Sequence, residues 1–166
     1  MPVFEWRSTV PFSADEVYAW HARPGSFERL TPPWQHVRVI ERIGGIESAG
    51  TLVFDYRSGP VRGRWVAVHG DATPGRRFTD RQIHGPFEEW EHTHSFIPQG
   101  PDQCIIEDHV EYRLPLGAVS DVLGGMPAER FLERLFRFRH ERTRADLQRH
   151  AEHADRHDRG DAGGGR

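Results

Sequence analysis

Two histidines suited to chemistry, His92 and His94, stand one residue apart between Trp90 and Phe96. Side chains of a β-strand alternate between its two faces, so these four residues share one face. The aromatic rings indicate that this face is the buried one. Because imidazole titrates near neutral pH, a buried pair of this kind can move a proton, hold a metal ion or orient a ligand.

A second arm precedes this segment, and Gly85-Pro86 supplies the turn that joins the two. In this arm Phe78, Asp80, Gln82 and His84 fall on a common face. The two arms therefore form a hairpin, and Asp80 is a carboxylate that this hairpin can offer to the histidines. Asp80 and Gln82 are equally placed to brace the turn.

A third segment, over about residues 103–114, supplies another carboxylate. Its inner face consists of Cys104, Ile106, Asp108, Val110 and Tyr112, and it alternates with a charged outer face. Asp108 is therefore carried into the interior. The alternation assigns faces only, and it places neither Asp80 nor Asp108 within reach of a histidine.

The histidine pair has four interpretations. A metal site would use both imidazoles with Asp80 or Asp108. Acid–base catalysis would use one imidazole, oriented and stabilised in its charged form by an inner carboxylate. Ligand anchoring would use the imidazoles as polar groups in a largely apolar pocket. A hydrogen-bonded network that binds nothing is the fourth.

Composition narrows the class of protein. A chain of 166 residues with 36% hydrophobic content is long enough for one domain with a packed core. The net charge of −3 gives no reason to expect nucleic-acid or membrane binding, and the absence of lysine excludes Schiff-base chemistry. One cysteine, no signal peptide and no apolar run of spanning length predict a cytoplasmic protein.

The remaining pattern predicts the elements that position these residues. Ser13 and Glu16 have the spacing of a capping box, so a helix begins there and ends before Pro24-Gly25. The expected order is a strand over 4–10, that helix, a short helix over 26–30, strands over 37–43, 51–58 and 64–72, the two arms, the strand over 103–114, and a helix from Pro127 to about His150. This order predicts an α+β fold with an antiparallel sheet.

Domain 1–150 is followed by a charged, glycine-rich tail over 151–166, which contains no large apolar residue. We expect this tail to be disordered or a frayed extension of the last helix.

Three motifs give the chain a family resemblance. They are the segment Gly85-Pro86-Phe87-x-x-Trp90-x-His92-x-His94-x-Phe96, the segment 108–112 (Asp-His-Val-Glu-Tyr) and the segment 138–143 (Phe-Arg-His-Glu-Arg-Thr). With them the chain resembles the START-like, Bet v 1-like proteins of the SRPBCC superfamily, often described as polyketide cyclase/dehydrase-like. The resemblance covers roughly residues 3–150. It implies a helix-grip fold, in which a curved antiparallel sheet wraps around a long C-terminal helix and leaves a cavity between them.

The function expected from this combination is the binding of a small hydrophobic or aromatic ligand in that cavity. The predicted ligand-contacting residues are Phe54, Tyr56, Trp65, Gln82, Trp90, His92, His94, Phe96, Asp108, Tyr112 and Phe138. The alternative is a cyclase or dehydratase in which His92, His94 and Asp108 are catalytic. The family branch is not known for metal, so no metal or cofactor is predicted. Arg139 and His140 either reach the cavity or pair with neighbouring glutamates.

Overall fold

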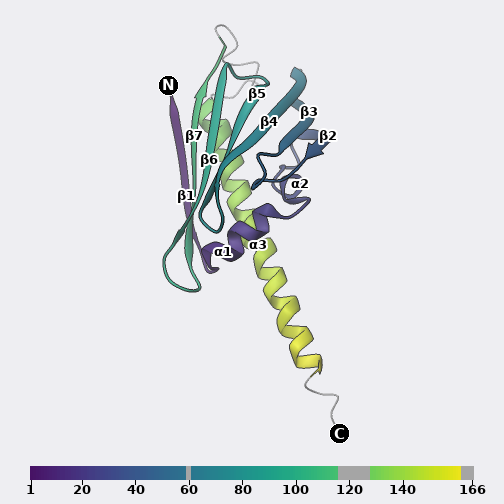
Figure 1. The fold of residues 1–166 in the computed structure, drawn as a ribbon, viewed down its shortest axis with the longest axis vertical. Helices are drawn as coiled ribbons and strands as arrows, with labels where there is room; N and C mark the ends of the chain where they lie inside the picture. Colours follow the sequence, from purple (N-terminus) through teal and green to yellow (C-terminus); the bar gives the residue numbers. More distant parts are fainter. Residues whose placement is uncertain (59–60, 116–127, 162–166) are drawn as a thin grey trace.

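The architecture is an antiparallel sheet with one long helix packed on it, as the computed structural model in Figure 1 shows. The structure describes residues 1–58, 61–115 and 128–161. The elements in chain order are β1 (Val3–Val10), α1 (Ala14–Ala22), α2 (Ser26–Arg29), β2 (His36–Ile43), β3 (Thr51–Ser58), β4 (Val61–Thr73), β5 (Arg77–His84), β6 (Glu89–Pro98), β7 (Cys104–Arg113) and α3 (Ala128–Asp161). The α+β helix-grip prediction is confirmed.

The sheet has seven strands in the order β1-β7-β6-β5-β4-β3-β2, and every pair is antiparallel. The chain forms a meander from β2 to β7, and β1 then closes onto β7. The pairing shifts register between Val39 and Glu41 in β2 and at two places in β4. Such irregularities bend strands and increase their twist, which allows the sheet to curve around a helix.

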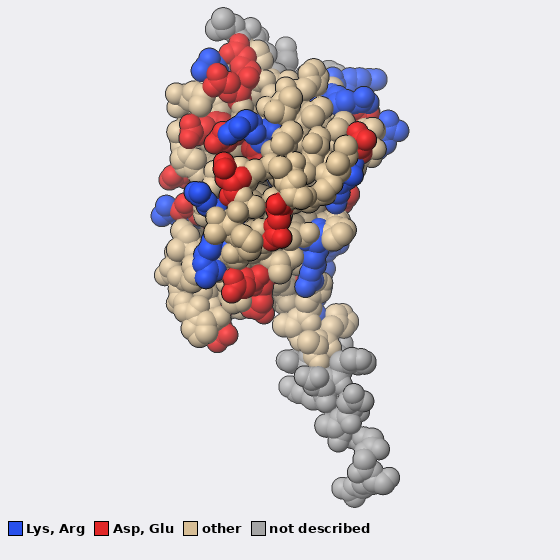
Figure 2. All heavy atoms as spheres, in the orientation of Figure 1, with Lys and Arg blue, Asp and Glu red and all other residues tan. Residues whose placement is uncertain are grey.

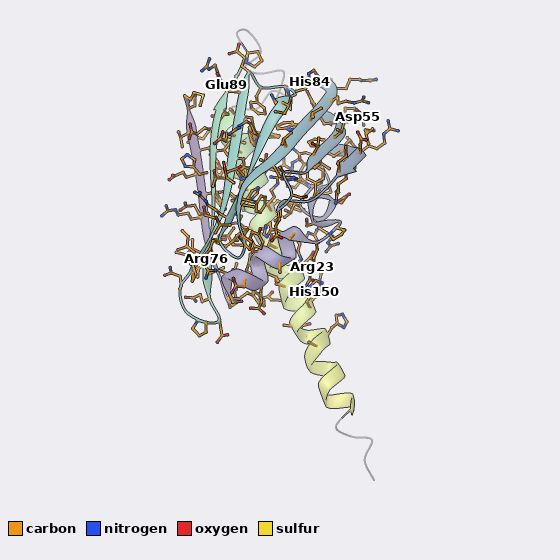
Figure 3. All side chains as sticks on the ribbon, in the orientation of Figure 1. Arg23, Asp55, Arg76, His84, Glu89 and His150 are labelled. Atoms are coloured by element: carbon orange, nitrogen blue, oxygen red, sulfur yellow. The ribbon has the colours of Figure 1, made fainter. Side chains whose placement is uncertain are left out.

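Helix α1 begins as its sequence predicts. The Ser13 side chain accepts from the Glu16 N–H, and the Glu16 carboxylate accepts in return from the Ser13 N–H at 2.9 Å. This reciprocal arrangement satisfies two backbone donors at the helix start. Figure 3 labels Arg23, which follows α1, and His150 of α3, and their side chains are joined at 3.0 Å where the two helices cross.

Helix α3 is longer than the predicted span. It crosses the sheet and projects beyond it at the C-terminal end (Figure 1), continuing past His150 to Asp161. Residues 151–161 of the expected tail thus belong to α3, and residues 162–166 lie outside the described part of the chain. No helix of the described residues is long and apolar enough to cross a bilayer.

Two apolar clusters form the core. The first packs α1 against the sheet and includes Val17, Tyr18, Phe78 and Phe96. The second packs the first half of α3 against β1, β6 and β7, with Phe136 fully buried. On the face shown in Figure 2, arginine and acidic side chains surround a broad area of other residues, and arginines gather at the upper right. The buried polar side chains, which include His92, His94 and Asp108, need a separate explanation.

Candidate functional site

A cavity of about 250 Å³ lies between the sheet and the helices. Strands β3 to β6 form its floor, and α3 contributes Phe131, Leu135 and Arg139 from one helical face. Much of its wall is aromatic and comes from Phe27, Phe54, Trp65, Phe78, Phe87, Trp90 and Phe131. Its polar lining includes Asp80, His92, His94 and Arg139, so ionisable groups converge in a mostly apolar space.

Six of the predicted ligand-contacting residues line this cavity: Phe54, Tyr56, Trp65, Trp90, His92 and His94. The other five do not: Gln82, Phe96, Asp108, Tyr112 and Phe138. These five side chains make other contacts, which differ from one residue to the next.

Gln82 supports the hairpin turn. Its side-chain amide donates to the Phe87 carbonyl at 2.8 Å and accepts from the Phe87 N–H at 3.3 Å. Phe96 belongs to the apolar cluster under α1, where its ring meets the edge of Tyr18 at a centroid distance of 5.8 Å. Both side chains are therefore occupied in packing or bracing the fold.

Tyr112 packs against Phe87 in the second core cluster, at the side of β7 that meets α3. Phe138 packs edge-on against Trp34, with centroids 5.3 Å apart. Asp108 is buried behind the two histidines, with 3% of its surface exposed, and it touches them without reaching the cavity.

His92 and His94 each contact both inner carboxylates. His92 Nε2 donates to Asp108 Oδ1 at 2.8 Å, and His94 Nε2 donates to Asp80 Oδ2 at 3.2 Å. The second nitrogens make the crossed contacts: His92 Nδ1 lies 3.0 Å from Asp80 Oδ2, and His94 Nδ1 lies 2.8 Å from Asp108 Oδ1. The two rings are close, with centroids 3.8 Å apart.

The strands explain why these groups meet. In the sheet register Asp80 is opposite His92, and His94 is opposite Asp108. Residues directly opposite on neighbouring strands have Cβ atoms only about 5 Å apart. The single strand β6 thus holds both imidazoles between a carboxylate from β5 and a carboxylate from β7.

The network continues to α3 and β1. His140 Nε2 donates to Asp108 Oδ2 at 2.5 Å, and His140 Nδ1 is 2.6 Å from Ser8 Oγ. On the other side, Trp90 Nε1 donates to Asp80 Oδ1 at 3.2 Å. Every oxygen of the two carboxylates therefore has a partner.

Electrostatics favour ionised carboxylates. Burial opposes the charge of Asp80, but its close contacts with His92 and His94 outweigh this effect and hold the pKa of Asp80 well below its usual range. Burial likewise opposes the charge of Asp108, and the three histidines hold its pKa well below the usual range. Burial also disfavours the charged form of His92, yet the two carboxylates raise its pKa.

Two further residues line the cavity that were not among the predicted ligand-contacting residues. Arg139 lines the cavity and forms no ion pair with any residue that the structure describes, and among these residues its buried Nε has no hydrogen-bond partner. Burial lowers the pKa of Arg139, partly opposed by the charges of Asp80 and Asp108. His21 also lines the cavity, and burial followed by the charge of His94 lowers its pKa to about 3. The helical period alone does not distinguish an inward Arg139 from an inward Phe138.

Three of the cavity-facing side chains could hold a metal ion. Asp80, His92 and His94 each offer one donor atom, and these atoms all lie within 4.8 Å of one another. Carboxylate and imidazole together suit divalent transition metals. The side chains of the site can thus bind an ion, exchange protons, or orient a polar ligand group.

The family model for polyketide cyclase / dehydrase and lipid transport matches residues 10–136. The chain belongs to this family. No curated protein sequence matches the chain. The family resemblance inferred from the hairpin, β7 and α3 motifs is therefore confirmed, and family membership leaves the individual ligand open.

Solved structures show the same fold. A nucleoside-diphosphate sugar epimerase from Corynebacterium glutamicum superposes with a TM-score of 0.65 at 29% identity; the match covers 87% of this chain but only 29% of the epimerase. A START superfamily protein from Mycobacterium smegmatis superposes with a TM-score of 0.66 at 11% identity, and the match covers 89% of this chain and 97% of that protein. Norcoclaurine synthase from Thalictrum flavum, in complex with dopamine and hydroxybenzaldehyde, superposes with a TM-score of 0.68 at 17% identity. That match covers 90% of this chain and 87% of the synthase.

Proposed function

We propose that this protein binds a small hydrophobic ligand with an aromatic ring in the cavity between the sheet and α3. The observation that carries the proposal is the aromatic wall around a space of about 250 Å³ with ionisable groups on one side. Ligand pockets are mostly apolar with a few polar groups that fix orientation. Stacked rings such as Phe54 and Trp65, with centroids 5.7 Å apart, offer flat surfaces to a planar ligand.

Arg139 defines the polar end of this ligand. Its guanidinium is directed into the site from α3 and has no carboxylate within ion-pair distance among the described residues. The carboxylates nearest in the site already face histidines. Arg139 is half-buried, and its Nε has no hydrogen-bond partner among the described residues, which is costly; a ligand oxygen with negative charge would offset that cost. The favoured ligand is therefore an aromatic molecule with a carboxylate or phenolate.

Calorimetric titration tests both statements with 2-naphthoate and the isosteric 2-naphthamide. We expect wild-type protein to bind both, the acid more tightly. Trp65→Ala removes a cavity wall and should weaken both at least tenfold, whereas Trp34→Ala, outside the cavity, should weaken neither. Arg139→Gln should abolish the preference for the acid, and Arg142→Gln should retain it. Absence of binding to wild type, or equal affinities for Trp65→Ala and wild type, would refute the proposal.

Acid–base catalysis on the bound ligand is a second candidate, because two imidazoles that contact carboxylates line the cavity. Exchange of the α-protons of 2-tetralone in deuterated water, followed by NMR, measures such catalysis directly. Wild type should accelerate exchange with a pH-dependent rate, and His94→Gln should lose that acceleration while His69→Gln retains it. Binding of 2-tetralone without acceleration by wild type would exclude this candidate.

A further inference from the structure

Three donor atoms at the cavity wall, one each from Asp80, His92 and His94, lie within 4.8 Å of one another. Asp80 Oδ2 lies 3.0 Å from His92 Nδ1 and 3.2 Å from His94 Nε2. Bonds of about 2.0–2.2 Å to Zn²⁺, at angles between roughly 90° and 110°, separate donor atoms by about 2.9–3.4 Å. Both separations from Asp80 Oδ2 fall in that interval.

The three side chains also have hydrogen-bond partners of the kind that orient metal ligands. A metal-bound histidine usually donates its other ring N–H to a carboxylate or carbonyl, which fixes the tautomer. Here the remaining nitrogens, His92 Nε2 and His94 Nδ1, both lie 2.8 Å from Asp108 Oδ1. The carboxylate of Asp80 is held in the same manner, because Trp90 Nε1 donates to its second oxygen at 3.2 Å.

A metal ion also resolves a deficit of hydrogen bonds. His92 is 1% exposed, and its Nδ1 is buried and lies close to Asp80 Oδ2 but makes no hydrogen bond. A neutral imidazole has one donor and one acceptor nitrogen. A cation coordinated by His92 Nδ1 and Asp80 Oδ2 would give this nitrogen the partner that it lacks.

We propose that Asp80, His92 and His94 form a binding site for a divalent transition-metal ion of the zinc or iron class, with Asp108 and Trp90 as positioning residues. Two imidazoles and one carboxylate leave coordination positions open, and the three residues line the cavity, so those positions face the bound ligand. The site does not depend on the proposed aromatic ligand, and it can be tested with the metal alone.

The test uses untagged full-length protein and Co²⁺, whose visible absorption reports coordination by nitrogen and oxygen. We expect one tightly bound Co²⁺ per chain, displaced by one equivalent of Zn²⁺ and not by Mg²⁺. Asp108→Asn should weaken Co²⁺ binding by roughly 10–100-fold, as outer-shell substitutions do, and Asp80→Asn and His94→Gln should weaken it further. His84→Gln, which alters an exposed histidine at the end of β5 outside the cavity lining, is the matched control and should bind as wild type does.

Absence of cobalt bands in wild type at millimolar Co²⁺ would overturn the metal site and leave the ligand proposal intact. Binding that persists unchanged in Asp80→Asn and His94→Gln would also overturn it, because the ion would then sit on other histidines. If a variant fails to fold by circular dichroism, wild-type NMR decides: Co²⁺ must shift the ring protons of His92 and His94 first. Earlier shifts at His150 or His153 of α3 would refute the site.

Discussion

Replacement of Asp108 by asparagine should be among the most destabilising conservative changes in this protein. Asp108 is buried, and its carboxylate faces three imidazoles, His92 and His94 at 2.8 Å and His140 at 2.5 Å. Asparagine keeps the shape but removes the charge, and its amide group turns a donor toward a donor. Hydrogen bonds to charged groups are worth about 1.5–3 kcal/mol each but are not additive, and breaking a buried ion pair costs about 3–5 kcal/mol. We therefore expect Asp108→Asn to lower the free energy of unfolding by about 3–5 kcal/mol.

Urea unfolding followed by tryptophan fluorescence measures this loss as a lower midpoint at unchanged slope. In a thermal scan the same loss corresponds to a Tm lower by roughly 6–20 °C for a chain of this size. Asp55→Asn is the matched control, because Asp55, labelled in Figure 3, pairs with Arg38 and Arg64 at the surface. Exposed pairs of this kind often contribute nothing measurable. A midpoint for Asp108→Asn equal to that of Asp55→Asn would refute the argument that the inner network stabilises the fold.

Three other outcomes follow from single contacts. The Arg29 guanidinium donates two hydrogen bonds to the Asp146 carboxylate, at 2.5 and 2.7 Å, and thereby lowers the pKa of that carboxyl. Asp146→Asn should therefore lower the free energy of unfolding by about 1–2 kcal/mol at pH 7. Because a depressed carboxyl pKa stabilises the fold only while the group is ionised, urea midpoints of wild type and variant should converge as the pH falls below about 4. Burial lowers the pKa of the His21 imidazole to about 3 in the folded protein, whereas the same group in the unfolded chain titrates near about 6.5. Between these two pH values only the unfolded chain binds the proton, so stability decreases as the pH falls. The urea midpoint of wild type should therefore fall more steeply between about pH 6 and 4 than that of His21→Gln. Ser13→Ala should lower the free energy of unfolding by about 1 kcal/mol through loss of the α1 cap, seen as a lower Tm, and Ser13→Asp should retain it.

The faces of the strands were predictable because alternation is a local property of the chain. The period-two pattern places His92, His94 and Asp108 on inner faces, and all three are buried. The capping box of α1 and the turn at Gly85-Pro86 were predictable for the same reason, since each depends on residues close in sequence.

The meeting of these groups was not predictable, because it depends on register between strands. Asp80 faces His92 only because β5 and β6 pair in one particular alignment, and a shift of one residue would turn it to the other face. The rotation of α3 is similarly a matter of packing. Phe136 and His140 are buried toward the sheet, which turns Arg139 into the cavity and leaves Phe138 against Trp34.

The placement of the ionic cluster itself argues for a role beyond stability. Replacement of a complete buried ion pair by apolar residues of similar volume is often neutral or stabilising, so a core does not need such a cluster to fold. This one lies where the two apolar core clusters meet: His94 stacks on Phe78 of the first at 4.3 Å, and His92 meets Phe136 of the second at 5.0 Å. Asp80 remains partly accessible, with 19% of its side chain exposed, while Asp108 behind it is closed off at 4%. A cluster that only stabilised the core would not need Asp80 to face a cavity while Asp108 stays buried. A site that acts on a ligand needs both: one group that the ligand can reach and a buried group that holds the histidines in place.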